Sequence, residues 1–213
     1  MKRARTHPAI ISYSLYLYYS STSFFRLETK CLSSVLRSRV SIWKWVQRYA
    51  FMADKFKIDR HKVRQIFVDE TLVKIDGMEY WLWVAYEPSL EVCLMMHLSR
   101  ERTILVCYQF FKQLRNSYGR KPIFTDGAYW YNTACRWLRL PHRMYGTEMK
   151  NIMERFIQHI KDRTECFDDD HFPCRKPDCD RQHIRNWLKL FVLYVHMDMD
   201  RIRFMIFLIM DGG

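Results

Sequence analysis

Apolar and polar positions alternate with helical spacing in the first quarter of the chain. Three segments that each follow a Thr or Ser capping residue are predicted as helices, at residues 8–19, 24–35 and 42–52. In the third segment the apolar residues recur at i, i+3, i+4 and i+7 and should face a core: Ile42, Trp45, Val46 and Tyr49. Helix, helix, short turn and helix is the layout of a helix-turn-helix module, which we place at residues 1–52.

The pattern changes after a charged linker at residues 53–64. Aromatic and β-branched residues then predict three consecutive strands, at residues 65–75, 79–86 and 91–98, with a hairpin turn at Asp76-Gly77. The rest of the chain predicts alternating helices and short strands: helix 102–118, strand 122–125, helix 129–138, strand 142–145 and helix 147–164. The resulting order, β-β-β-α-β-α-β-α, is that of an α/β domain.

The positive charge of the chain is concentrated in its first third. The 213 residues contain 35 Lys and Arg against 23 Asp and Glu, a formal net charge of +12. Residues 1–68 hold 14 basic and three acidic residues, whereas the remainder is nearly neutral. A basic module ahead of a balanced domain favours binding to a polyanion such as DNA, although a basic surface also serves solubility.

Composition excludes several protein classes. Hydrophobic residues make up 49% of the chain and only six Gly and six Pro occur, which excludes disordered and collagen-like chains. Seven cysteines, an odd number, fit reduced thiols in the cytoplasm better than a disulfide framework. The apolar runs at residues 10–19 and 202–210 are too short to span a bilayer, so we expect a cytoplasmic protein without a membrane partner.

Three acidic residues occupy positions where catalytic groups often lie. Asp69 closes the first predicted strand, Asp126 follows the fourth, and Glu154 lies within the last helix. The first and fourth strands of such a fold are neighbours, so the three carboxylates are expected to form one cluster. Clustered carboxylates repel one another unless a hard cation such as Mg²⁺ joins them, and paired ions of this kind support phosphodiester chemistry. Three unrelated surface acids remain the alternative.

These motifs together resemble one known family. The segments Asp69-Glu70-Thr71, Thr125-Asp126 and Glu154 with Lys161 are similar to motifs of the DDE transposases of insertion sequences, in particular the IS-six-type group and its archaeal members. Residues 40–47 and 154–169 are similar to that group as well. The resemblance covers roughly residues 8–195.

The resemblance implies a fold, a site and an activity. The fold would be a ribonuclease H-like integrase catalytic domain at residues 65–195, followed by a tail at 196–213 that matches poorly. Asp69, Asp126 and Glu154 would be the catalytic metal ligands, holding two Mg²⁺ or Mn²⁺ ions. The activity would be cleavage and strand transfer of transposon ends, with terminal inverted repeats and target DNA as partners, in a homodimer or higher oligomer associated with the nucleoid. A catalytically inactive DNA-binding remnant or regulator is the alternative.

Candidate DNA contacts lie on two predicted helices. Lys44, Gln47 and Arg48 share the face of the third helix opposite its apolar residues, and these residue types read base edges and bind phosphates. A solvated face of an ordinary helix would have the same pattern. Lys161 lies two helical turns beyond Glu154, and the resemblance implies that it contacts a DNA phosphate. Glu70 should point to the opposite face of its strand from Asp69, so we do not expect it to be a ligand.

A second group of residues has the chemistry of zinc ligands. Cys174, Cys179 and His183 are spaced at four and three intervening residues, and Cys166 or His171 could supply a fourth ligand. This spacing is not that of a standard zinc knuckle, so reduced loop cysteines are the alternative. A zinc-stabilised interaction module is therefore a third functional class.

Overall fold

The computed structural model of the chain describes residues 6–20, 39–56, 58–75, 77–164, 181–194 and 207. The chain divides into two compact units, which are described separately below. Residues 58–175 form the sheet unit, and residues 1–57 and 176–213 form the helical unit. Among the described residues, no helix combines the length and apolar character needed to cross a bilayer. The predicted helix at 24–35 lies outside the described residues.

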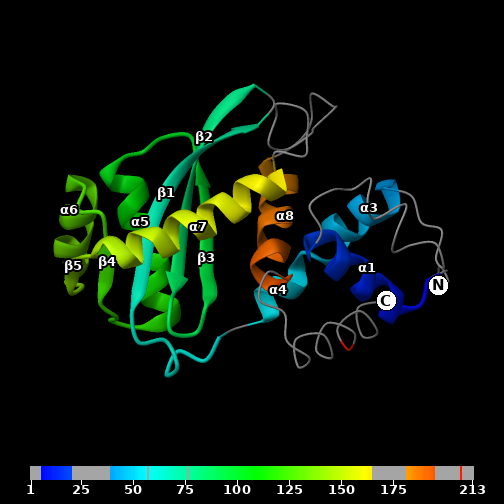
Figure 1. The fold of residues 1–213 in the computed structure, drawn as a ribbon, viewed down its shortest axis with the longest axis horizontal. Coiled ribbons are helices and arrows are strands. Elements are labelled where there is room, and N and C mark those ends of the chain that lie inside the picture. The colour runs from blue at the N-terminus through cyan, green and yellow to red at the C-terminus, as the bar shows by residue number, and fades with distance from the viewer. Residues whose placement is uncertain are drawn as a thin grey trace. The chain divides into compact units, whose positions relative to one another are not determined.

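A five-stranded mixed sheet is the centre of the sheet unit (Figure 1). The strands are β1 (Ile66–Ile75), β2 (Met78–Glu87), β3 (Val92–Ser99), β4 (Ile123–Thr125) and β5 (His142–Met144). Their order across the sheet is β3-β2-β1-β4-β5, antiparallel from β1 to β3 and parallel from β1 through β4 to β5. The predicted order of strands and the adjacency of the first and fourth strands are thus confirmed.

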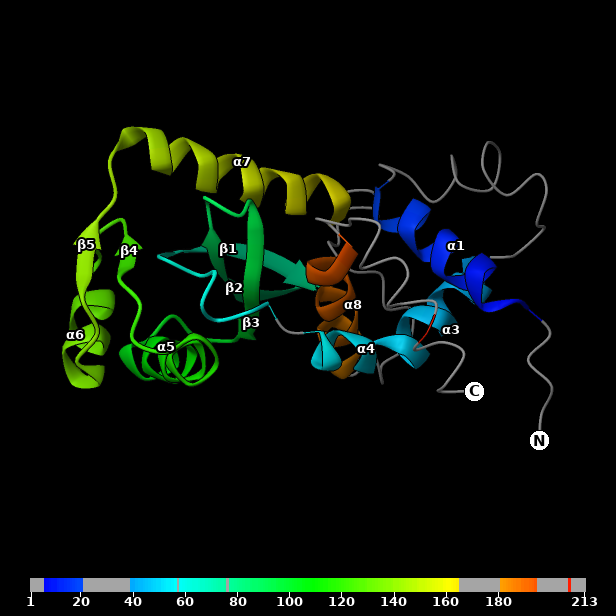
Figure 2. The same cartoon turned by 90° about the horizontal axis from the view of Figure 1, so that it is seen from below.

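Three helices cover the sheet, and each agrees with the sequence pattern. They are α5 (Ile104–Tyr118), α6 (Tyr129–Leu138) and α7 (Thr147–Thr164). Figure 2 shows α5 and α6 on one face of the sheet and α7 on the other. The Thr103 side chain caps α5 by accepting the N–H of Val106 at 3.4 Å, and Gly119 ends it with φ +82°.

Strand alternation assigns the two faces of the sheet. Ile66 and Val68 belong to the core that the sheet forms with α5 and α6. The opposite face meets α7, where the ring of Tyr86 lies 4.9 Å from that of Phe156. Because Phe67 pairs with Tyr86 in the β1–β2 ladder, odd-numbered residues of β1 face α7. Asp69 therefore lies on the α7 face and Glu70 on the α5–α6 face, as the sequence predicted.

A buried carboxylate fixes the entry of the chain into the sheet. Glu87, at the end of β2, has no solvent exposure. Its Oε2 accepts the N–H groups of Arg64 and Gln65 at 2.9 and 2.8 Å. Its Oε1 accepts the N–H and hydroxyl of Ser89 at 3.1 and 2.6 Å. These bonds satisfy a buried acid and hold the residues that precede β1, the strand that carries Asp69.

The helical unit contains α1 (Pro8–Ser20), α3 (Arg39–Tyr49), α4 (Phe51–Lys55) and α8 (Arg181–Tyr194). The predicted core face of α3 is confirmed for Ile42, Val46 and Tyr49, which are buried, whereas Trp45 is half-buried. Aromatic residues join α1 to α8: the Nε1–H of Trp187 donates to the hydroxyl of Tyr18 at 2.6 Å.

The grouping of α8 differs from the domain boundary expected at residue 195. The structure places α8 in one unit with the N-terminal helices, and its contacts explain why. The hydroxyl of Tyr19 donates to the Trp187 carbonyl at 3.1 Å, and Lys189 pairs with Asp54 at 2.7 Å. The apolar face of α8 is thereby buried against α1, α3 and α4. Apart from Phe207, which is exposed, the predicted tail at 196–213 lies outside the described residues.

Candidate active site

Two of the three expected carboxylates lie on neighbouring parallel strands. The β1–β4 ladder pairs Ile66 with Ile123 and Phe67 with Phe124. Continuing this register by two residues places Asp69 level with Asp126, just beyond the end of β4. The predicted meeting of these two residues thus follows directly from the strand register.

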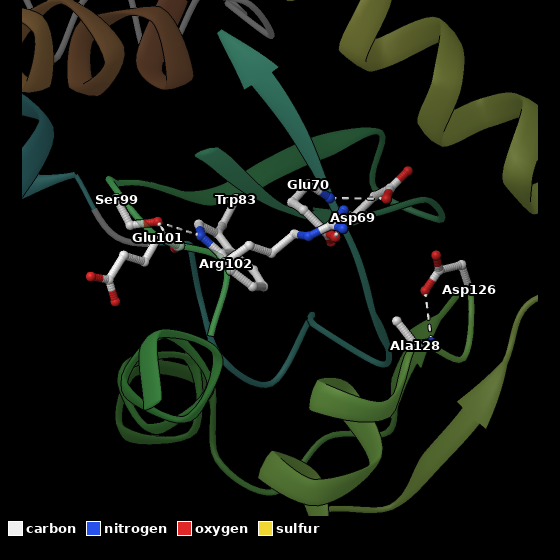
Figure 3. Close-up of polar contacts among 8 residues, drawn as sticks. All are labelled: Asp69, Glu70, Trp83, Ser99, Glu101, Arg102, Asp126 and Ala128. Atoms are coloured by element: carbon white, nitrogen blue, oxygen red, sulfur yellow. Dashed lines mark hydrogen bonds and ion pairs between the residues drawn. The ribbon is translucent and has the colours of Figure 1, made fainter. Parts of the chain in front are cut away.

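Local hydrogen bonds hold both carboxylates. Oδ1 of Asp69 accepts a hydrogen bond from the N–H of Glu70 at 2.9 Å. Oδ1 of Asp126 accepts one from the N–H of Ala128 at 3.0 Å, and this bond closes the turn into α6 (Figure 3). The turn needs glycine, because Gly127 has φ +92° and a Cβ there would lie 2.8 Å from Cε of Met144.

Glu154 approaches from α7, the helix that covers this face of the sheet. Its side chain is 58% exposed, and its Oε1 lies 3.8 Å from Nζ of Lys150, one helical turn earlier. Lys161 is half-buried further along the same helix. Glu154 is thus exposed on α7, with its carboxylate beside a lysine.

The electrostatics link all three acids. The pKa of Asp69 is raised from 3.8 to about 6. Burial is the largest cause, and the negative charges of Asp126 and Glu154 also raise this pKa, whereas the N–H of Glu70 and the charge of Lys150 lower it. Burial, together with the charges of Asp69 and Asp126, raises the pKa of Glu70 to about 7. Negative charge thus raises the pKa of Asp69 and Glu70 even with Lys150 and Arg102 nearby, which is a condition that a divalent cation relieves.

The donor set fits Mg²⁺ in part. Hard carboxylate oxygens are its preferred ligands, and Mg²⁺ often uses one or two carboxylates together with water and phosphate oxygens. Asp69 and Asp126 meet that requirement. Among the residues that the structure describes, however, no three His, Cys, Asp or Glu side chains lie close enough together to hold one ion. The expected cluster of Asp69, Asp126 and Glu154 around one ion is therefore not formed among the described residues.

Tyr145 belongs to this site although the sequence pattern marked it only as the end of a strand. Its ring stacks on Phe67 with 6.1 Å between centroids, and its N–H donates to the Thr125 carbonyl at 3.0 Å. Burial raises the pKa of the Tyr145 phenol, and the charges of Asp69, Asp126, Glu70 and Glu154 raise it further. A neutral phenol therefore accompanies the carboxylates. An aromatic residue in a short strand carries no signal that sequence analysis could use.

The raised pKa of Asp69 makes a prediction about stability. The folded chain binds this proton more tightly than the unfolded chain, so the Asp69 contribution to stability is lost as the pH rises from about 4 to about 6. We expect Asp69→Asn to increase the free energy of unfolding at pH 8 without metal by up to about 3 kcal/mol, at about 1.4 kcal/mol per pKa unit. Thermal unfolding in EDTA at pH 4 and pH 8 measures this.

The control is Glu79→Gln, which removes an exposed carboxylate from β2. It should leave stability nearly unchanged at both pH values. At pH 4 the advantage of Asp69→Asn should shrink, because the native aspartate is then protonated. A variant that is equally or less stable than the parent at pH 8 without metal would contradict the electrostatic description of the site.

The candidate DNA contacts of α3 have two different environments. Lys44 and Arg48 are exposed, as a phosphate-binding role requires. Gln47 is half-buried: its Oε1 accepts from Nδ2 of Asn186 at 2.9 Å, and its Nε2 donates to the His183 carbonyl at 3.3 Å. The side-chain amide of Gln47 thus joins α3 to α8 in the helical unit.

The zinc hypothesis falls mostly outside the described residues. Cys174 and Cys179 lie there, together with the further candidates Cys166 and His171. His183 is described: it lies in the first turn of α8, and its ring lies 6.1 Å from that of Trp43. In the described part of the chain, Cys93, Cys107 and Cys135 are free and buried, in line with reduced thiols.

Comparisons with known proteins identify a family for this chain. Residues 63–179, more than half of the chain, match the family model of the IS240-type DDE domain. An uncharacterized protein of Methanocaldococcus jannaschii, MJ0017, is 27% identical over 137 residues, which are 64% of this chain. The chain spans 62% of the length of that relative.

Solved structures with a similar fold include two retroviral proteins. The catalytic core domain of BIV integrase is 18% identical, with a TM-score of 0.45 over 64% of this chain and 86% of that one. A chain of the simian T-cell lymphotropic virus intasome is 14% identical, with a TM-score of 0.47 over 84% of this chain and 69% of that one. The sheet unit itself is a five-stranded mixed sheet of order β3-β2-β1-β4-β5, and the ribonuclease H-like fold stays a prediction from the resemblance.

Proposed function

The chain belongs to the IS6/IS240 family of DDE transposases, and from this premise we propose that it cleaves DNA at the ends of an insertion sequence and joins them to target DNA. The observation that carries the proposal is the strand register that sets Asp69 level with Asp126, beside the helix that carries Glu154. The proposed partners are terminal inverted repeats and target DNA, bound by a homodimer or higher oligomer in the cytoplasm.

Mg²⁺ or Mn²⁺ would be held by Asp69 and Asp126, with Glu154 as the proposed third ligand. When bound, such ions neutralise charge on the phosphodiester and activate the attacking oxygen. The protein contributes rigid placement: β1 and the turn before α6 hold two carboxylates, while α7 brings the third. Lys150 and Lys161 on α7 would attract the DNA backbone toward the same face.

The helical unit would supply DNA binding. We propose phosphate contacts for Lys44 and Arg48, which are exposed on α3, and for Lys161 on α7. Gln47 stays the candidate for base contact, although its amide also bonds to α8. The sequence places this module at residues 1–52 and the catalytic domain at residues 65–195. The structure groups α8 with the N-terminal helices, so we propose that α8 supports the DNA-binding module.

These contacts predict a distinct salt dependence. Each lost phosphate contact should reduce the slope of log affinity against log salt by about 0.9. We expect Lys44→Ala and Arg48→Ala each to lower affinity for end DNA and scrambled DNA alike and to reduce the slope by one such step. Fluorescence anisotropy at several salt concentrations measures both quantities. Lys74→Ala, on β1, serves as a control on an exposed basic residue outside α3.

A slope unchanged in both α3 variants would place the DNA surface elsewhere. The proposed function itself is tested by incubating the chain with Mg²⁺ and labelled DNA that contains the flanking inverted repeat. Cleavage at the repeat boundary that disappears in EDTA supports it. Specific binding without cleavage in either Mg²⁺ or Mn²⁺ contradicts it.

That last outcome would support the second candidate function, a DNA-binding remnant without catalysis. One observation favours it: Glu154 pairs with Lys150 at 3.8 Å and does not join a three-ligand group among the described residues. The same DNA-cleavage experiment therefore decides between the two candidates.

A further inference from the structure

Behind the candidate active site, an arginine lies between two indole rings. The guanidinium carbon of Arg102 is 4.1 Å from the ring centroid of Trp81 and 4.5 Å from that of Trp130. Its Nη1 is 3.4 Å from Oε1 of Glu70. Figure 3 shows the Arg102 side chain extended across the sheet toward Glu70. A planar guanidinium suits this position, because it stacks on both faces while its edge donates hydrogen bonds.

Glu70 needs that partner. Its side chain is only 4% exposed, and its Oε2 has no hydrogen-bond partner among the described residues. An acid this deeply buried is costly unless a cation lies beside it. Nε1 of Trp130 is also buried without a partner in the described part of the chain. Arg102 contacts both residues, Glu70 through its charge and Trp130 through its ring.

The cluster connects the two segments that carry the catalytic candidates. Glu70 follows Asp69 directly on β1, and Trp130 lies in the first turn of α6, just after the Asp126 turn. The backbone ladder between β1 and β4 pairs only residues 66 and 67 with 123 and 124. It therefore ends before either carboxylate. We call Arg102, Trp130 and Glu70 the clamp. Its contacts connect β1 to the start of α6 beyond the last hydrogen-bonded pair of β1 and β4.

We propose that Arg102 is a positioning residue that sets the spacing of Asp69 and Asp126 for a divalent cation. The inference rests on the proposed function, since it assumes that these carboxylates bind the ion. Arg102 itself lies on the α5–α6 face with Glu70, opposite the face of Asp69, and acts through the packing of its neighbours. Groups bonded directly to a metal ligand typically change metal affinity by 10- to 100-fold when they are replaced, and Arg102, which acts through Glu70 and Trp130, is expected at the lower end of that range.

The test compares two arginines from the same loop. Arg102→Lys keeps the positive charge but removes the planar guanidinium that packs on Trp81 and Trp130. A change in Mn²⁺ affinity in this variant therefore reflects the lost packing and not a change in net charge. Arg100→Lys is the matched control: its guanidinium lies 4.5 Å from the Tyr80 ring and has no carboxylate partner recorded in the described residues. Mn²⁺ binding to the full chain without DNA is followed by electron paramagnetic resonance of the free ion.

We expect Arg102→Lys to weaken Mn²⁺ binding by about tenfold, while Arg100→Lys binds as the parent does. Trp130→Phe, which keeps a ring against the guanidinium, should give an intermediate loss and remains informative if Arg102→Lys fails to fold. Mn²⁺ affinity equal to the parent in the folded clamp variants would overturn the inference. So would reduced DNA affinity with unchanged Mn²⁺ affinity, which would make Arg102 a direct DNA contact.

Mn²⁺ binding to the parent chain and to Asp69→Asn separates failure of the inference from failure of the proposed function. If the parent chain itself binds no Mn²⁺, the proposed function fails and the inference fails with it. If the parent binds Mn²⁺ and loses it in Asp69→Asn, but not in the clamp variants, the inference alone fails.

Discussion

Asp126→Asn should abolish cleavage of end DNA while leaving its binding intact. The substitution keeps a side-chain oxygen for the N–H of Ala128, so the turn into α6 should persist. It removes a charged ligand that the proposed cation requires, an interaction worth several kcal/mol. At about 1.4 kcal/mol per factor of ten, the rate should fall by roughly 10³-fold or more. Single-turnover cleavage in Mg²⁺ and anisotropy on the same DNA measure the two effects separately.

The matched control is Asp59→Asn, which changes an acid in the loop before β1. Asp59 accepts the N–H of His61 at 2.9 Å and lies outside the candidate site. It should cleave at the parental rate. Equal loss of binding and cleavage in Asp126→Asn would indicate misfolding, and a parental cleavage rate would remove Asp126 from the catalytic set.

The second large effect is expected from Trp187→Ala in α8. Trp187 is 2% exposed, stacks on Phe191 with 5.1 Å between centroids, and donates to the Tyr18 hydroxyl at 2.6 Å. Truncating a buried tryptophan costs about 3–5 kcal/mol, which is a large share of the stability of a small unit. We therefore expect the helical unit to open and specific end binding to be lost.

Hydrogen exchange locates this loss. Amides of α1, α3 and α8 should lose protection in Trp187→Ala, whereas those of β1 to β3 should keep it. Trp187→Phe, which keeps the stacking and loses the N–H, should cost only about 1 kcal/mol. Loss of protection in the strands, with α1 and α3 unaffected, would mean that α8 belongs to the catalytic domain, as the 65–195 boundary expected.

Periodicity predicted the sheet unit well because its signals are local. The aromatic run in β2 and the turn at Gly77 define the hairpin, and α7 has the bounds expected from its apolar spacing. The placement of Asp69 and Asp126 at the ends of adjacent strands followed from the element order. These features need only neighbouring residues and the rules of sheet topology.

Long-range contacts explain what the sequence did not predict. The sequence analysis predicted no element at Arg181–Tyr194, where the structure has α8. Gln47 and Asn186 are 139 residues apart, so their hydrogen bond has no local signal. The same holds for Arg102 and Glu70, which are 32 residues apart. Helix spacing does not determine the exposure of Glu154 or its pairing with Lys150, because both depend on side-chain conformation.

The most direct measurement of the central claim is the joining of an end to target DNA. A labelled duplex that carries the inverted repeat with a free 3′-hydroxyl is incubated with supercoiled plasmid, the chain and Mg²⁺. The account predicts label covalently joined to plasmid with the parent protein, and none with Asp126→Asn or in EDTA. Absence of joined product from the parent, at protein concentrations that saturate the labelled end, would contradict it.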